Sequence, residues 1–329
     1  MTKAIENVLR SVRFGEPQRH RDMQVYPLYS PEGSTVEYLT LDEAVEAGLL
    51  RVEEMSYHGE VPRLRVFNRA AQPVLLLDGE ELFGAKQNRA LNTTILLREK
   101  SETAIPVSCT EAGRWNYIMD HFVPSGVVME RQVRACKLRS VSRSLECSAQ
   151  FLSDQGLVWS ELDGLHAQAG VAPPTGAMYD AFVSHERELR CALEVFRLMP
   201  GQKGLLVVLK GEAVGLDLLS SEAAYVRLHS KLVKSYLLEA LRKRADAPPD
   251  KRQGQDEAKA FLEESLQCEV REFPSVGYGQ DCRFKGARIV GSGLVHENGL
   301  IHAAFFRVNG NQPSEGTGPR WWRRRNCFD

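Results

Sequence analysis

The sequence predicts an α+β fold in which a mostly antiparallel β sheet, of sandwich or barrel type, is followed by a helical second half. Short apolar runs separated by Gly, Pro and Asn turns fill the β-rich segment, residues 1–128. Amphipathic periodicity replaces them in residues 129–245, which also contain one β-hairpin. Residues 246–329 are predicted to form a linker, a helix and a β-rich tail that returns to pack on the rest, because the tail is small for a core of its own.

The first segment opens with a helical turn and continues as strands. Thr40 and Glu43 form a capping box for one short helix, which Gly48 ends. The strands are predicted from the runs VYPLYS (25–30), VEYLT (36–40), LLRVEEM (49–55), LRVFN (64–68), PVLLLDGEEL (73–82), TTILL (93–97) and TAIPVSC (103–109).

The second half begins with helices over 130–152 and 157–170, followed by one opened by Thr175 and Gly176 and continuing to Pro200. A β-pair turns at Lys210-Gly211, and a strongly amphipathic helix covers 220–244. Residues 244–256, RADAPPDKRQGQD, are the predicted linker. The β-rich tail contains a hairpin at Asn298-Gly299.

Composition narrows the function classes. With 43% hydrophobic and 26% charged residues and a net charge of -1, the chain has the composition of a soluble protein and no overall field to attract nucleic acid. No apolar run reaches the roughly 20 residues that span a bilayer, and the N-terminus lacks the apolar centre of a secretion signal. We therefore expect a cytoplasmic protein with no membrane partner. Cofactor and oligomeric state stay open.

Cysteine and histidine patterns give no metal signature. The seven cysteines contain no C-x-x-C pair, and none of the eight histidines forms H-x-H or H-E-x-x-H. The sequence thus predicts reduced thiols and no metal site.

Acidic residues at a predicted turn are the candidate catalytic groups: Asp78, Glu80 and Glu81. Carboxylates at a strand end can act as a general base, accept sugar hydroxyls or bind a cation. In an extended strand, Glu80 and Glu81 point to opposite faces. The alternative is that all three acids only solvate the turn.

Cations, amides and an aromatic ring nearby are the candidate ligand-binding groups: Lys86, Gln87, Asn88, Arg89, Glu111, Arg114 and Trp115. The first four suit a phosphate or the polar edge of a base, while Arg114, Trp115 and Tyr117 resemble a cradle for a planar anion. Alternatively, Lys86 and Arg89 neutralise Asp78 or Glu81, and the aromatic residues cover a sheet edge. Cys109 is more consistent with a buried structural thiol than with a nucleophile.

A run of basic residues on the first long helix is a candidate anion or nucleic-acid contact: Arg131, Arg134, Lys137, Arg139 and Arg143. A basic helix packed against acidic neighbours has the same pattern. The RWWRRR run, 320–325, combines aromatic and basic residues in the same way but follows a Gly/Ser/Pro segment.

Several blocks closely resemble one bacterial family: LLLDGEELFGAKQNRALNTTILL, IPVSCTEAGRW, SDQGLVW, PTGAMYDAF and GLDLL. Over about Val25 to Val308 the chain resembles the ADP-ribosylglycohydrolase and rhodanese-phosphatase associated protein domain family. The resemblance implies a role near NAD or ADP-ribose metabolism.

Two functions are consistent with these residues. One is binding or processing of a nucleotide-derived small molecule such as ADP-ribose, with Asp78 or Glu81 as acid, base or metal ligand, Lys86 and Arg114 as anion clamps and Trp115 as stacking platform. The other is a non-catalytic sensor or scaffold that binds a metabolite or a partner protein. Both require these side chains to gather around one hollow.

Overall fold

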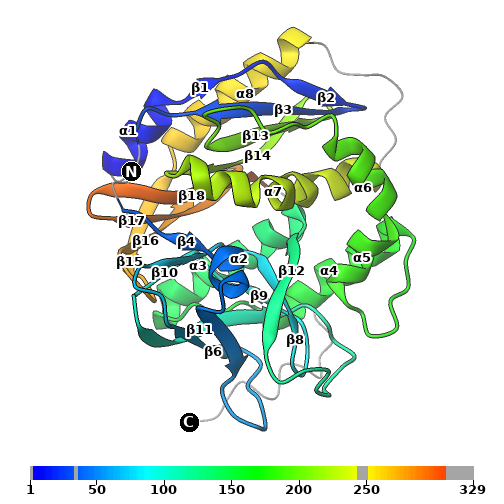
Figure 1. Cartoon of the computed structure of the whole chain (residues 1–329). Coiled ribbons are helices and arrows are strands. Elements are labelled where there is room, and N and C mark those ends of the chain that lie inside the picture. The colour runs from blue at the N-terminus through cyan, green and yellow to red at the C-terminus, as the bar shows by residue number, and fades with distance from the viewer. Residues whose placement is uncertain (1–2, 33–35, 243–250, 309–329) are drawn as a thin grey trace.

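The computed structural model describes residues 3–32, 36–242 and 251–308 and contains a large antiparallel sheet, a closed barrel and helices between and around them (Figure 1). The α+β prediction is confirmed, including the barrel in the N-terminal half and the return of the C-terminal strands to a sheet that contains N-terminal ones.

The large sheet combines strands from all three predicted segments. Its order is β1-β3-β13-β14-β18-β17-β16-β15, and β2 pairs with β3. The strands are β1 (Arg13–Phe14), β2 (Gln18–His20), β3 (Met23–Tyr29), β13 (Gly204–Leu209), β14 (Glu212–Leu219), β15 (Glu269–Pro274), β16 (Gln280–Lys285), β17 (Ile289–His296) and β18 (Gly299–Arg307).

Both faces of the large sheet are covered by helices. Ile5 of α1 (Lys3–Ser11) and Phe261 of α8 (Lys251–Leu266) pack on one face, in a core with Tyr26 and Leu206. The opposite face packs against α3 (Arg131–Ser148) and α7 (Glu222–Arg242), while α4 (Gln155–Ala169) packs on α3 and on the barrel strand β11. In Figure 1, α7 lies between the large sheet and the barrel.

The barrel closes in the order β11-β6-β5-β12-β8-β9. Its strands are β5 (Leu50–Glu54), β6 (Arg63–Asn68), β8 (Glu80–Gly84), β9 (Arg89–Leu91), β11 (Ser101–Cys109) and β12 (Phe122–Val128). A small sheet beside it contains β4 (Leu39–Thr40), β7 (Val74–Leu76) and β10 (Ile95–Leu97). Alternate apolar residues such as Val52, Leu82 and Ile105 form a third core with Leu41 of α2 (Leu41–Glu46).

Local signals located several elements correctly. Thr40 accepts a hydrogen bond from the Glu43 amide at 3.4 Å while the Glu43 carboxylate accepts one from the Thr40 amide at 2.9 Å, which confirms the capping box. The β13–β14 turn is at Lys210-Gly211, both at positive φ, as predicted. The tail hairpin is also present, although its turn residues are Glu297 and Asn298, one position earlier than expected.

Several predicted elements are wrong in extent, among them the strand predicted over 36–40, which covers only Leu39–Thr40. The run 73–82 is not one strand, because Gly79 turns the chain at φ +81 and places β7 and β8 in different sheets. The helix expected up to Pro200 starts at Met178 and breaks at His185, giving α5 (Met178–Ser184) and α6 (Glu186–Leu193).

The linker predicted over 244–256 is also wrong in extent, because its last part is helical from Lys251. Residues 243–250 of that linker and the RWWRRR run lie outside the described residues.

Candidate functional site

Asp78 and Glu80 lie in buried salt bridges. The Asp78 carboxylate contacts the Lys137 ammonium and lies 3.7 Å from Nε of Arg134, both on α3. Glu80 Oε1 lies 2.8 Å from Nζ of Lys231 on α7, which also contacts Asp42 at 2.6 Å. These acids therefore join the barrel to two helices. A catalytic role for them stays a prediction.

Glu81 lies in a second place, as expected from its alternation with Glu80. Its Oε1 accepts a hydrogen bond from the Thr110 hydroxyl at 2.7 Å, and the side chain is almost completely buried. Burial raises the pKa of Glu81 to about 8, so this carboxyl group is mostly protonated at neutral pH. A protonated acid can donate a proton or a hydrogen bond but cannot act as a base.

The other seven predicted residues converge at one end of the barrel. Arg114 uses its guanidinium group to hold two loops together: it pairs with Glu111 at 2.6 Å and donates to the Gly84 and Ala85 carbonyl oxygens and to Oδ1 of Asn88. Burial alone would raise the pKa of Glu111, but hydrogen bonds from Arg114 and other neighbours keep it below its usual range. Arg114, Asn88 and Glu111 thus form a structural clip.

Arg89 lies inside this end of the barrel, fully buried. Its Nη1 donates to Oε1 of Gln87 at 2.9 Å, but Nε and Nη2 have no hydrogen-bond partner in the described part of the chain. Burial lowers the pKa of Arg89 and raises that of the neighbouring Cys109 thiol, which donates to Gln87 at 3.2 Å. The prediction that Cys109 is buried is confirmed, and its structural role stays a prediction.

Three exposed aromatic rings lie around the Lys86 ammonium group, and we call Tyr57, Trp115 and Tyr117 the aromatic rim. Nζ of Lys86 lies 5.7, 5.2 and 5.1 Å from their respective ring centres and donates to the His58 carbonyl at 3.0 Å. The Arg89 guanidinium lies 5.6 Å from the Trp115 ring, which is 42% exposed. The rim therefore combines exposed aromatic surface with the buried Arg89 cation next to Trp115.

Pairing of Lys86 or Arg89 with Asp78 or Glu81, the alternative drawn from sequence, is wrong. Asp78 is neutralised by α3, and Glu81 is held by a hydroxyl group. The hydrogen-bond and salt-bridge partners of the three acids therefore lie outside the group of seven ligand-binding candidates.

Sequence reasoning missed Glu54 and Tyr57. Glu54 alternates in phase with the buried Leu50 and Val52 on β5. An acid at such a core position is the sequence signal that could have identified it as a candidate site residue. Its Oε1 accepts from the Lys86 amide at 3.4 Å, and burial raises its pKa. Tyr57 lies in a loop and carries no such signal.

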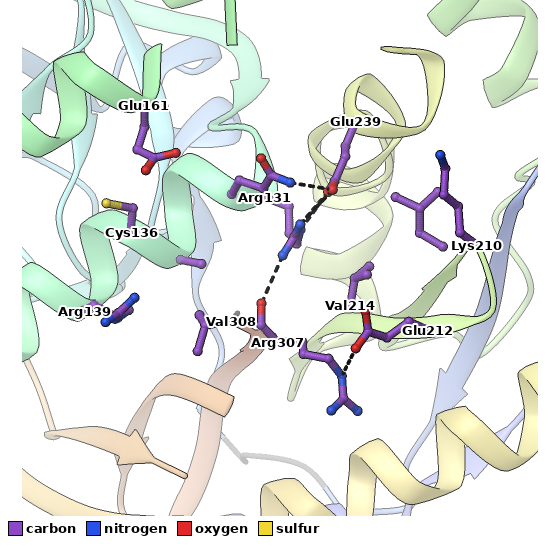
Figure 2. A pocket seen from close by; sticks show the side chains of 13 residues that line it. Arg131, Cys136, Arg139, Glu161, Lys210, Glu212, Val214, Glu239, Arg307 and Val308 are labelled. Carbon is purple, nitrogen blue, oxygen red and sulfur yellow. Dashed lines mark hydrogen bonds and ion pairs between the residues drawn. The ribbon is translucent and has the colours of Figure 1, made fainter. Parts of the chain in front are cut away.

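The basic helix is mostly packed against acids, as the alternative interpretation held. Arg131 pairs with Glu239 at 2.7 Å and Arg134 pairs with Asp217 at 2.8 Å, in addition to the Lys137–Asp78 pair. Arg139 instead lines a pocket of about 290 Å³ between α3, α7 and the β13–β14 hairpin (Figure 2). None of the ten predicted residues lines this pocket.

The described residues contain neither a cluster of metal-binding side chains nor a membrane-spanning helix. Within residues 3–32, 36–242 and 251–308, no three His, Cys, Asp or Glu side chains form a cluster that could hold a metal ion. None of the helices in these ranges is both long and apolar enough to cross a bilayer.

Fold and site together define an α+β protein whose small barrel carries a buried arginine, Arg89, next to an exposed tryptophan ring. Residues 11–306 match the ARG and Rhodanese-Phosphatase-superfamily-associated Protein domain, and the chain belongs to that family. The family name records an association with ADP-ribosylglycohydrolase and with the rhodanese-phosphatase superfamily. No curated protein and no solved structure matches the chain.

Proposed function

We propose that the chain binds a nucleotide-derived small molecule of the ADP-ribose type at the aromatic rim, in NAD or ADP-ribose metabolism. The observation that carries the proposal is the Arg89 guanidinium, which is fully buried beneath Trp115 with two nitrogen atoms lacking acceptors. A buried unsatisfied donor costs about 1–3 kcal/mol, and more when charged. A phosphate group would supply the missing acceptors.

The rim supports the same ligand class. Adenine or nicotinamide can stack on an exposed Trp or Tyr ring, and the Glu54 carboxylate can accept sugar hydroxyl groups. Because the Trp115 ring covers Arg89, the proposal requires this ring to turn aside when a phosphate binds. The loops that carry Tyr57 and Trp115 are connections between strands, where such movement costs least.

Binding is favoured over processing by the placement of the acids. Asp78 and Glu80 are committed to lysine partners, and Glu81 faces Thr110. None of these contacts the aromatic rim through a hydrogen bond, salt bridge or ring contact in the described residues.

Calorimetry with ADP-ribose tests the proposal. The wild type should bind, and Arg89→Gln and Trp115→Ala should each weaken binding by about tenfold or more, as expected for loss of a charge-assisted hydrogen bond or a stacked ring. Trp115→Phe keeps a ring and should retain most of the affinity. Arg98→Gln is the matched control, because Arg98 stacks on Tyr278, which is not part of the rim. Equal affinity of all four variants for ADP-ribose would rule out the aromatic rim as its binding site.

A turnover assay separates binding from processing. Incubation of the wild type with ADP-ribose should leave it intact by chromatography. Hydrolysis that is abolished by Asp78→Asn or Glu81→Gln, with ADP-ribose affinity preserved, would instead assign these acids a catalytic role. Absence of both binding and turnover for a panel of NAD-derived compounds would leave the sensor or scaffold function, with a protein partner.

A further inference from the structure

The pocket in Figure 2 shares no residue with the aromatic rim, and its walls come from other elements. One wall is the face of α3 that carries Gln132, Ala135, Cys136 and Arg139, which are spaced as neighbours on a helix surface. The opposite wall is the β13–β14 hairpin with Lys210 at its turn. The pocket has a volume of about 290 Å³, near the lower end of the range for small-molecule sites.

Most charges in the pocket are already paired. Arg131 pairs with Glu239 and also donates to the Arg307 carbonyl at 3.1 Å, while Gln132 donates to Glu239 at 2.7 Å. Arg307 donates to the Ala213 carbonyl at 2.8 Å and pairs with Glu264 at 3.0 Å. These interactions fix the floor of the pocket and leave little net charge there.

Two cations that line the pocket are not paired in this way. Arg139 and Lys210 make no salt bridge or side-chain hydrogen bond among the described residues, and Figure 2 shows them on opposite sides of the pocket. Two further acids line the pocket: Glu161 lies beside Cys136 in Figure 2, and Glu212 pairs with Arg288 at 2.6 Å and with Arg307 at 3.6 Å. Burial raises the pKa of Glu161 and that of the Cys136 thiol, the latter to about 12. The lining thus carries four cations, Arg131, Arg139, Lys210 and Arg307, against three acids, Glu161, Glu212 and Glu239, and the two cations without a salt bridge face the pocket from opposite sides.

We propose that this pocket is a second binding site, for a small metabolite with two anionic groups, such as a sugar bisphosphate. One anionic group pairs with Arg139 and the other with Lys210. Between them the ligand body lies over the Arg131–Glu239 pair, whose fixed polar atoms are suited to hydroxyl groups.

Fructose 1,6-bisphosphate and fructose 6-phosphate are the probes. In calorimetry at low ionic strength, the bisphosphate should bind at least about tenfold more tightly than the monophosphate, since it uses both cations. Arg139→Gln and Lys210→Asn should each bring bisphosphate affinity down by about tenfold, to the level of the monophosphate. Asn is chosen because residue 210 has φ +55, a conformation that Asn tolerates.

Arg143→Gln is the matched control, since it removes an arginine from the same helix but does not line the pocket. It should leave bisphosphate affinity unchanged. Equal affinity for the two probes, equal effects of all three variants, or no binding of either probe by the wild type would overturn the proposal. The Arg89→Gln variant should still bind the bisphosphate, so failure at the rim and failure at this pocket are distinguishable.

Discussion

At the scale of single residues, Glu81 shows how burial changes the chemistry of a side chain. The folded protein holds this carboxyl group away from water and binds its proton more tightly than the unfolded chain does. Because its pKa rises from 4.5 to about 8 on folding, its contribution to stability is fully present below about pH 4.5 and is lost as pH rises through 8.

Glu81→Gln should therefore flatten part of the pH dependence of stability. Relative to wild type, the variant should gain stability as pH rises from 5 to 9, by up to about 1.4 kcal/mol per pH unit. Urea unfolding at several pH values measures this difference. Glu263→Gln, on an exposed part of α8, is the control and should follow the wild type. A constant difference between Glu81→Gln and wild type across this range would contradict the assigned pKa.

Residue-level prediction from sequence succeeded where the cause was local. The Thr40–Glu43 capping box and the Lys210-Gly211 turn depend on residues a few positions apart, and both are present. In contrast, Glu80 is neutralised by Lys231, 151 residues later, and no local pattern identifies that partner.

At the scale of elements, α3 carries a chain of buried charges that links the two β layers. Arg134 pairs with Asp217 of the large sheet and lies near Asp78 beside the barrel, while Lys137 also contacts Asp78. Tyr236 donates to the same Asp217 at 2.8 Å. Such a network favours one relative placement of helix, sheet and barrel, because any other leaves charges unpaired in the interior.

Lys137→Met should destabilise the protein by about 3–5 kcal/mol, because it leaves Asp78 buried without its nearest cation. Pairing it with Asp78→Leu should recover most of this loss, since replacing both partners removes the uncompensated charge. Chemical denaturation of the two variants tests this. Arg10→Gln, which breaks an exposed pair with Glu6, should cost less than about 1 kcal/mol. A Lys137→Met effect as small as that of Arg10→Gln would show that the network contributes little.

Substitution of two glycines in the barrel strands distinguishes the cost of a steric clash from the cost of backbone strain. Both Gly84 and Gly126 have positive φ, but a Cβ on Gly84 would lie 2.5 Å from the His121 carbonyl oxygen, whereas nothing lies within 4 Å of one on Gly126. Gly126→Ala should cost about 1 kcal/mol through backbone strain alone, and Gly84→Ala considerably more. Thermal unfolding of both variants checks the order, and equal losses would contradict the packing at the end of β8.

At the scale of the whole molecule, the layers depend on distant parts of the chain. β3 pairs with β13, and β14 pairs with β18, so the large sheet is complete only with strands from both ends. Periodicity predicted most of these strands but not their order, because pairing is set by contacts between segments far apart in sequence.

Residues 1–128 expressed alone should not fold. The fragment lacks β13 beside β3 and also lacks the lysines that neutralise Asp78 and Glu80. Its amide NMR spectrum should show the narrow dispersion of an unfolded chain, whereas the full chain should be well dispersed. A dispersed spectrum with cooperative thermal unfolding would show that the β-rich segment is an independent domain.

The pairing of β3 with β13 also bears on synthesis of the chain. The ribosome releases β3 long before β13, and Glu80 long before Lys231. During most of translation the nascent polypeptide therefore exposes an open strand edge and uncompensated acids, which invite association with other chains. Chaperones that hold such intermediates should increase the yield of this protein in cell-free translation.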